Sequence, residues 1–247
     1  MLTRRTFLAF STVLAGCGGG GGSDSAPDAL NPGPGAPPPL APAINEPFRR
    51  GDPANQPLVL APAGPAGLAE WVGEDVIAGF VQAGFFVIGA HWPGLDGGVE
   101  DFGAQNAKIP GWLAAQSLGR KPMLYAQSRG GLQLLNFACD HPDSFMKIAA
   151  LYPVTDPLVY PGEGEPLWRA WGTTEASFPV LASTPNLRAA SLRGRPIKIW
   201  HGDQDAVVPK QRTTDVFAAA SGAEVVTLPG VGHVPLWLPE IGAWLKA

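Results

Sequence analysis

Short apolar runs alternate with longer segments of helical periodicity from about residue 47 to the end of the chain. Several of the runs predict strands because they are short, bounded by turn residues and rich in β-branched or aromatic residues. These strands are expected at Leu58–Leu60, Phe85–Ile88, Met123–Tyr125, Ile148–Tyr152, Ile197–Trp200 and Val225–Thr227. Helices are expected at residues 74–83, 105–118, 129–140, 211–221 and 236–246.

This alternation predicts the fold class. Strands that are apolar throughout are typical of a sheet covered on both faces, and a strand–helix alternation favours parallel strands. We therefore expect an α/β domain with a doubly wound, mostly parallel sheet of about six or more strands. A length of 247 residues and a hydrophobic content of 45% suit one such domain.

The first 46 residues do not share this pattern and are expected to lie outside the domain. Residues 1–17 contain a basic pair, a short apolar stretch and small residues before Cys17, which is the layout of an export signal. Residues 18–46 are rich in glycine and then in proline, so they predict a flexible linker. The domain then spans residues 47–247, with a small lid or insertion expected at residues 155–195.

Two local motifs refine the export signal. Thr3-Arg4-Arg5-Thr6-Phe7-Leu8 resembles the twin-arginine export motif, and Leu14-Ala15-Gly16-Cys17 resembles the lipobox of bacterial lipoproteins. The resemblance implies that Cys17 carries a lipid that anchors the protein in the bacterial cell envelope, on the periplasmic side or at the cell surface. The alternative is a soluble secreted protein whose cysteine happens to lie at the cleavage site.

The charge of the chain excludes one class of partner. The formal net charge is −4 and becomes −6 once Arg4 and Arg5 leave with the signal. Such a chain has no excess of cations to neutralise a phosphate backbone, so nucleic acid is not an expected partner. Attraction to anionic lipids is also weak, which leaves the lipid as the expected anchor. With Cys17 acylated, only Cys139 is a free thiol, so no disulfide within the chain is expected.

The segment Ala126-Gln-Ser128-Arg-Gly130 carries the first candidate for chemistry. It follows a predicted strand, precedes a predicted helix and surrounds one serine with small residues. This layout is typical of a nucleophile elbow, a strained turn that exposes the serine hydroxyl at the edge of the sheet. The following helix offers N–H groups to a developing oxyanion. Taken alone, Ser128 is equally explained as an ordinary N-cap.

Two further motifs follow later strands. His201-Gly-Asp203-Gln-Asp205-Ala-Val-Val-Pro places two aspartates in a turn, and Gly232-His233 comes after the last predicted strand. With these motifs, and with Ser128 in its elbow pattern, residues 57–247 resemble the α/β-hydrolases. The resemblance implies that Ser128 is the nucleophile, Asp205 the acid and His233 the base of a catalytic triad.

The resemblance also implies an oxyanion hole made of two backbone N–H groups. The N–H of Arg129, which follows the nucleophile, is the first. The second is expected in the loop after the first predicted strand, at Ala63 or at Gly64, because the neighbouring prolines have no N–H to donate. This loop has Pro62-Ala63 where the family commonly has a His-Gly pair.

Several other polar residues have simpler explanations. Asp203 and Asp156 are weaker candidates for the acid. His201 ends a strand and is interpreted as structural, while His141 is expected to close a helix, where a cation suits the dipole. A metal site made of His201, Asp203, Asp205 and His233 would leave the serine motif unexplained, so neither a metal nor a cofactor is expected.

Four aromatic or imidazole side chains are candidates for contact with a substrate. His91 and Trp92 follow the second predicted strand, at the sheet edge where doubly wound folds bind ligands. Trp168 and Trp171 lie in the predicted insertion, where they either contact the substrate or pack the insertion onto the domain.

Together these observations predict a membrane-anchored serine hydrolase that cleaves small-molecule carboxylic esters through an acyl-enzyme. A peptidase or a lactone hydrolase is an alternative, because the same triad performs acyl transfer with different leaving groups. A non-catalytic binding module on a hydrolase scaffold is an alternative of another class. Labelling by a probe for active serines would distinguish this module from an enzyme.

Overall fold

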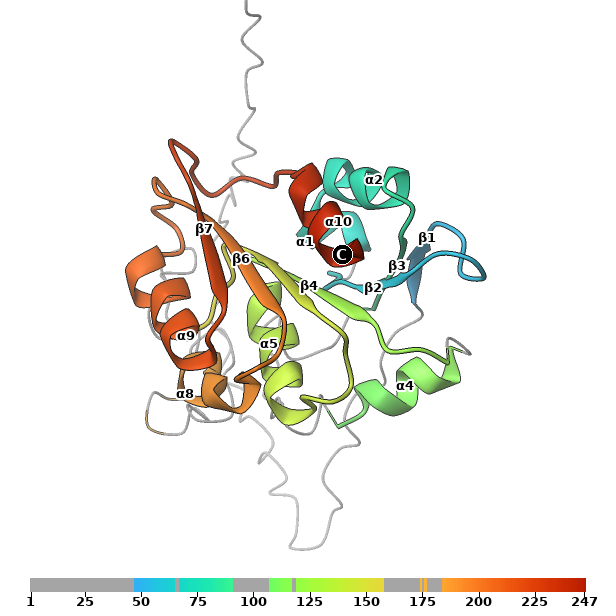
Figure 1. Cartoon of the computed structure of the whole chain (residues 1–247), viewed down its shortest axis with the longest axis horizontal. Helices are drawn as coiled ribbons and strands as arrows, with labels where there is room; N and C mark the ends of the chain where they lie inside the picture. Colours follow the sequence, from blue (N-terminus) through green and yellow to red (C-terminus); the bar gives the residue numbers. More distant parts are fainter. Residues whose placement is uncertain are drawn as a thin grey trace, which may run out of the picture. The chain divides into compact units, whose positions relative to one another are not determined.

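The computed structural model describes residues 47–64, 67–90, 107–116, 119–157, 174, 176 and 184–247. Their strands are β1 Phe48–Arg50, β2 Leu58–Leu60, β3 Phe86–Gly89, β4 Met123–Gln127, β5 Ile148–Leu151, β6 Ile197–Gly202 and β7 Glu224–Leu228. They form one seven-stranded sheet in the order β1-β3-β2-β4-β5-β6-β7 (Figure 1). Only β1 pairs antiparallel, with β3. The predicted mostly parallel sheet is confirmed.

Each predicted strand is present, and some continue beyond their apolar stretch. Gln127 at the end of β4 is still in register with Leu151, and Gly202 at the end of β6 is in register with Leu228. Backbone pairing does not depend on side-chain polarity, so it carries these strands up to the turns that hold the candidate residues. The short edge strand β1 was not among the predicted strands.

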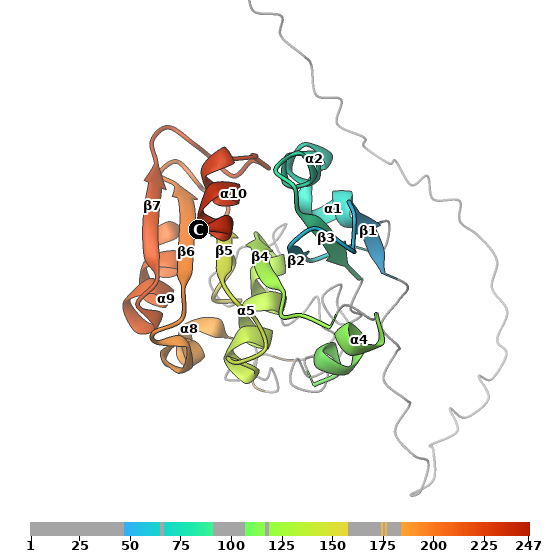
Figure 2. The same cartoon turned by 45° about the vertical axis from the view of Figure 1, so that its right-hand side comes forward.

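Alternate residues of the central strands pack into two apolar cores, one on each face of the sheet. In β2, Leu58 and Leu60 belong to one core and Val59 to the other. The first core includes residues of α4 Ile109–Ala115, α5 Gly130–Asp140 and α9 Thr214–Ser221. The second includes residues of α1 Leu68–Val72, α2 Glu74–Gln82 and α10 Pro239–Lys246. Figures 1 and 2 show these two groups of helices on opposite sides of the strands.

The helices agree with the sequence pattern best where they are long. α2 and α5 nearly match the predicted residues 74–83 and 129–140. α10 begins later than predicted because Pro239, whose fixed φ suits the first turn, stands at its start. α9 is also shorter than predicted, and a 3₁₀ helix at Lys210–Arg212 precedes it. The five-residue helix α1 was missed because one turn is too short to show helical periodicity.

The expected insertion at residues 155–195 is described only in part. Its last part forms α8 Pro185–Arg188 and a 3₁₀ helix at Ala189–Leu192. Ala189 and Leu192 are fully buried in the core that contains α5 and α9. This stretch is therefore part of the helical layer over the sheet and not of a lid.

Some sequence predictions concern residues outside the described ranges. These include the export signal, the linker and Cys17. Among the described residues, we find no helix with both the length and the apolar character that a membrane crossing requires.

Candidate active site

Ser128 lies in a strained turn between β4 and α5. Its φ is +48°, a left-handed value that is unusual for a residue with a side chain. The turn is held from several sides, because the Ser128 N–H donates to Leu151 O at 3.2 Å and Ser128 O accepts from the N–H groups of Gly131 and Val154 at 2.9 and 2.8 Å. Backbone strain of this kind persists only where the surrounding structure enforces it. The turn has the geometry that the elbow motif predicts.

Two glycines after the serine allow neighbouring segments to approach the turn. A Cβ on Gly130 would lie 2.2 Å from Cγ of Pro62, in the loop after β2. A Cβ on Gly131 would lie 2.7 Å from Cβ of Pro153, after β5. Both distances are shorter than real carbon contacts, so a side chain at either position would push these loops away. Ala126, two residues before Ser128, is fully buried in β4, so the sheet accommodates its methyl group where the elbow pattern commonly has glycine.

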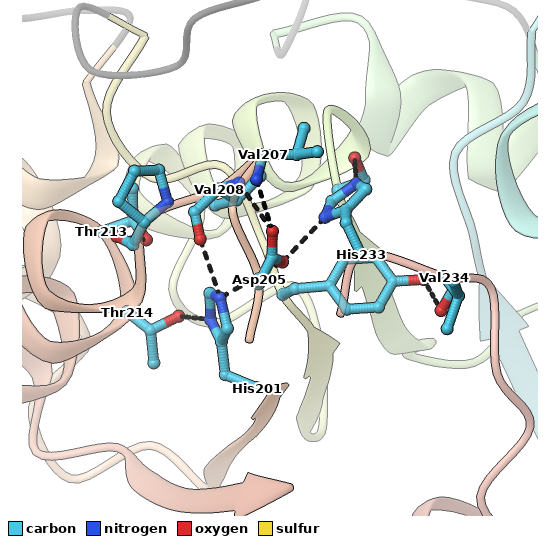
Figure 3. A network of polar contacts seen from close by, with 11 residues as sticks. His201, Asp205, Val207, Val208, Thr213, Thr214, His233 and Val234 are labelled. Atoms are coloured by element: carbon cyan, nitrogen blue, oxygen red, sulfur yellow. Dashed lines mark hydrogen bonds and ion pairs between the residues drawn. The ribbon is translucent and has the colours of Figure 1, made fainter. Parts of the chain in front are cut away.

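Asp205 lies in the turn after β6, and its carboxylate is fixed by the backbone that follows it (Figure 3). Oδ1 accepts from the N–H groups of Val207 and Val208 at 2.9 and 2.8 Å. The side chain is fully buried. A buried carboxylate must have hydrogen-bond donors on both oxygens, and here the chain immediately after it satisfies one of them.

The turn that contains Asp205 is tied to the loop that contains His233. The Asp203 N–H donates to Leu228 O at 3.1 Å, and the Gln204 N–H donates to Val231 O at 3.0 Å. The Asp203 carboxylate accepts from the Gly230 N–H at 2.7 Å. A Cβ on Gly202 would lie only 2.0 Å from Val231 O, so the two segments meet where β6 has no side chain. These contacts fix the distance between Asp205 and His233.

Ser128, His233 and Asp205 form one chain of short polar contacts. Ser128 Oγ is 2.8 Å from His233 Nε2, and His233 Nδ1 is 2.8 Å from Asp205 Oδ2. Because a carboxylate only accepts, Nδ1 carries the proton and Nε2 is left to accept from the serine hydroxyl. The structure thus brings together the three residues that the motifs indicate.

Opposing effects act on the pKa of Asp205. Burial raises the pKa, but hydrogen bonds from His201, His233 and the Val208 N–H outweigh burial and hold it well below the usual aspartate value. The carboxylate is therefore ionised throughout the neutral range, the state in which it orients and stabilises a protonated His233.

Tyr152 supports the other side of His233, and sequence reasoning missed this residue. Its ring packs against the imidazole with centroids 4.3 Å apart, and its hydroxyl donates to Val234 O at 2.6 Å. Its φ is +36°, a second strained position directly after β5. Burial, and then the charge of Asp205, raise the pKa of the phenol, so it stays a donor. The only signal in the sequence was a tyrosine at the end of a predicted strand.

The predicted oxyanion donors lie next to the elbow. Arg129 directly follows Ser128 and is the N-cap residue of α5, which begins at Gly130. Ala63 is fully buried and follows Pro62, which meets Gly130 of the elbow. The Gly64 N–H already donates to Gly67 O at 3.2 Å, which favours Ala63 over Gly64 as the second donor.

The alternative acids and histidines lie elsewhere or have other contacts. Asp203 is exposed and binds the Gly230 N–H, as a turn residue does. Asp156 is half-buried in the segment after β5. The carboxylate that contacts His233 Nδ1 belongs to Asp205 and not to Asp156. His141 follows the last residue of α5 and lies against Phe137. His201, by contrast, is fully buried directly beside Asp205.

The residues expected to contact a substrate, His91, Trp92, Trp168 and Trp171, lie outside the described residues. Within the residues that the structure does describe, no three His, Cys, Asp or Glu side chains are grouped so that they could hold a metal ion.

Solved structures resemble this chain in fold. The monoacylglycerol lipase of Paleococcus ferrophilus has a TM-score of 0.58 at 18% identity, over 82% of this chain and 96% of that one. MGS-MChE2, an α/β hydrolase enzyme from a sediment metagenome of the Mar Chica lagoon, Morocco, has a TM-score of 0.56 at 16% identity, over 78% of this chain and 90% of that one. A structure from work on carboxylesterases of Nitrososphaera gargenis has a TM-score of 0.54 at 17% identity, over 76% of this chain and 86% of that one. No family model and no curated protein matches the sequence.

Proposed function

We propose that this chain, which has the α/β-hydrolase fold, is a serine hydrolase that cleaves small carboxylic esters through an acyl-enzyme. One observation carries the proposal. The Ser128 hydroxyl, in a strained turn where β4 meets α5, lies 2.8 Å from a histidine that is itself 2.8 Å from a buried carboxylate. An N-cap serine has no need of such a partner, whereas a serine nucleophile requires a base within hydrogen-bond reach.

The acylation step follows from this arrangement. Ser128 Oγ attacks the carbonyl carbon of the ester while its proton passes to His233 Nε2. The tetrahedral intermediate carries a negative oxygen, for which the N–H groups of Arg129 and Ala63 are the proposed donors. When the intermediate collapses, the bond to the alcohol oxygen breaks and His233 returns the proton to that oxygen. The alcohol leaves and the acyl group stays on Ser128.

Deacylation repeats the same proton transfers with water. His233 takes a proton from a water molecule, whose oxygen attacks the acyl-enzyme carbonyl. The second intermediate collapses with cleavage of the bond to Ser128 Oγ, and His233 returns the proton to the serine. The carboxylic acid leaves, and the enzyme is restored with one ester and one water consumed.

Asp205 contributes through its charge and its fixed position. Its hydrogen bond to Nδ1 holds His233 in the tautomer that accepts from Ser128, and its negative charge stabilises the imidazolium that forms in each step. The N–H groups of Val207 and Val208 keep the carboxylate from rotating as the charge on His233 changes. The dipoles around it are therefore already oriented before the reaction.

An ester is the substrate class that the comparisons favour. A monoacylglycerol lipase is among the solved structures that share the fold, and carboxylesterases are the subject of another. The triad itself defines only acyl transfer, so this preference comes from those proteins.

We also propose that the protein is a lipoprotein of the bacterial envelope, anchored by a lipid on Cys17. The twin-arginine-like pair and the lipobox-like Leu14-Ala15-Gly16-Cys17 support this location. A net charge of −6 after loss of the signal leaves the acyl chains as the main source of membrane affinity.

An active-site serine probe tests the proposed chemistry directly. A fluorophosphonate should label the wild-type protein at Ser128 and should not label Ser128→Ala. Ser144→Ala is the matched control, because Ser144 lies in a turn after α5 and has no part in the proposed site. Turnover of a panel of ester, lactone and peptide substrates then identifies the bond that is cleaved. A folded wild-type protein that the probe leaves unlabelled would contradict the proposal.

A further inference from the structure

His201 is a second imidazole beside the carboxylate of Asp205. It belongs to β6, is fully buried and lies between the turn of Asp205 and the start of α9 (Figure 3). Its Nδ1 is 2.7 Å from Thr214 Oγ1 and its Nε2 is 3.0 Å from Val208 O. The same Nε2 is 3.4 Å from Asp205 Oδ2.

The partners of His201 fix where its proton resides. Val208 O and the Asp205 carboxylate both only accept hydrogen bonds, so Nε2 must carry a proton. In the neutral imidazole Nδ1 is then an acceptor, and the Thr214 hydroxyl donates to it. Thr214 thus selects the tautomer of His201 that points its N–H toward the acid.

His201 and Val208 contact each other and both contact the Asp205 carboxylate. Asp205 Oδ1 accepts from the N–H of Val208, while the carbonyl of the same residue accepts from His201 Nε2. The Nε2–H also faces Oδ2, the oxygen that accepts from His233 Nδ1 at 2.8 Å. Movement of His201 would therefore release the turn that holds Oδ1 and would also remove a dipole from the oxygen that orients His233.

We propose that His201 is a positioning residue of the catalytic machinery, which acts on His233 through Asp205 and Val208. The inference rests on the proposed function. It differs from the expectation that His201 is merely structural, because the two interpretations assign different importance to its two nitrogens. A core histidine needs its volume and any satisfied hydrogen bond, whereas a positioning residue needs the donor at Nε2.

Two substitutions distinguish the role of His201 Nε2 from that of His201 Nδ1. In His201→Gln the side-chain amide nitrogen reaches about the place of Nε2 and keeps a donor for Val208 O and Asp205. In His201→Asn the shorter amide reaches about the place of Nδ1 and keeps only the contact with Thr214. We expect kcat of the Asn variant to fall by about tenfold to a hundredfold, since small displacements of catalytic groups have effects of that size. KM should change little, and the Gln variant should recover most of kcat.

Thr214 provides a second and milder pair of variants. Thr214→Val keeps the shape of the side chain but removes the hydroxyl that fixes the His201 tautomer, whereas Thr214→Ser keeps the hydroxyl. We expect Thr214→Val to lower kcat and Thr214→Ser to retain it. His141→Gln is the control for loss of an imidazole, because His141 lies at the end of α5 and contacts Phe137.

A measurement without substrate keeps this inference separate from the proposed function. The proton shared by His233 Nδ1 and Asp205 should give a strongly downfield NMR resonance in the wild-type protein. We expect the resonance to weaken or shift upfield in His201→Asn and Thr214→Val, and to persist in His201→Gln and Thr214→Ser. It should be lost in Asp205→Asn, which assigns it.

The outcomes are distinct. If the folded Asn variant of His201 keeps the wild-type resonance and kcat, the positioning role is wrong. Equal losses in the Gln and Asn variants would also overturn it, since only the volume of the imidazole would then matter. If the wild-type protein hydrolyses no substrate and is not labelled at Ser128, the proposed function fails, and the NMR comparison still decides whether His201 orders the Asp205–His233 pair.

Discussion

Ser128 Oγ and His233 Nε2 lie 2.8 Å apart although 105 positions separate them in the sequence. Parallel strands explain this proximity, because β4 and β7 both deliver their following loops to the carboxyl edge of one sheet. Contacts between the loops then set the final distance. The Asp203 and Gln204 N–H groups hold the His233 loop, and the Tyr152 hydroxyl holds Val234 next to the imidazole.

The two aspartates of the turn after β6 should differ sharply in their importance for catalysis. Asp205→Asn should lower kcat by about a thousandfold or more, because an amide no longer enforces the His233 tautomer that accepts from the serine. Asp203→Asn should have a much smaller effect, since an amide oxygen still accepts from the Gly230 N–H. Steady-state kinetics on an ester substrate compare the two. The reverse ranking would move the role of the acid to Asp203.

Replacement of Ser128 should separate activity from stability. Both Ser128→Ala and Ser128→Gly lack the nucleophile and should lose kcat by at least about a thousandfold. Glycine adopts the left-handed φ of +48° without strain, so the Gly variant should be more stable than the Ala variant by roughly 1 kcal/mol. Denaturant unfolding measures the difference. Equal stabilities would argue that the turn is not strained.

Much of the site is evident from the sequence because its residues lie in local motifs. The two glycines after Ser128 reflect a close approach of other loops that a Cβ would prevent. The paired N–H groups on Asp205 come from the next three residues of the chain. Such short-range requirements leave a pattern in a single sequence. The apolar strands that position the motifs are equally evident because they are buried on both faces.

The supporting residues could not be predicted because their roles depend on contacts between distant segments. The Tyr152 hydroxyl donates to the carbonyl of Val234, 82 positions later, and the residues next to Tyr152 in the sequence do not indicate that contact. His201 was interpreted as a structural residue at the end of a strand, but its relation to Asp205 depends on how the turn after β6 places the carboxylate next to the imidazole. The short elements β1, α1 and α8 were missed for another reason, since three to five residues carry no measurable periodicity.

Acid should destabilise the protein partly through Asp205. Its pKa is lowered on folding, so below the usual aspartate value of about 3.9 the unfolded chain binds a proton that the folded protein does not. The stabilisation is therefore complete above that pH and is lost as the pH falls toward the lower folded-state pKa. The free energy of unfolding, measured between pH 6 and pH 3, should decline less steeply for Asp205→Asn. An unchanged slope would contradict the lowered pKa.

The lipid anchor should depend on one thiol. Cys17→Ser removes the atom that would carry the lipid, so the variant should leave the membrane fraction, because a domain of net charge −6 has little other attraction to a membrane. Detergent phase partitioning and the mass of the mature N-terminus check this. Cys139→Ser is the matched control, since Cys139 is a buried residue of α5. A Cys17 variant that stays wholly in the membrane would contradict lipid anchoring.

Loss of the Tyr152 hydroxyl should affect catalysis as well as stability. Tyr152→Phe keeps the ring against His233 but removes the 2.6 Å hydrogen bond to Val234 O, which holds the residue directly after the base. Tyr125→Phe is the control, because the Tyr125 hydroxyl is also buried and donates at 2.6 Å, but to Gln127 on its own strand. Each change should cost about 1 kcal/mol of unfolding free energy, the usual net value of one hydrogen bond. Only Tyr152→Phe should also lower kcat, by about fivefold, if a similar energy is lost from the positioning of His233 in the transition state. Equal activity of the two variants, at equal loss of stability, would show that the Tyr152–Val234 bond supports the fold without orienting the base.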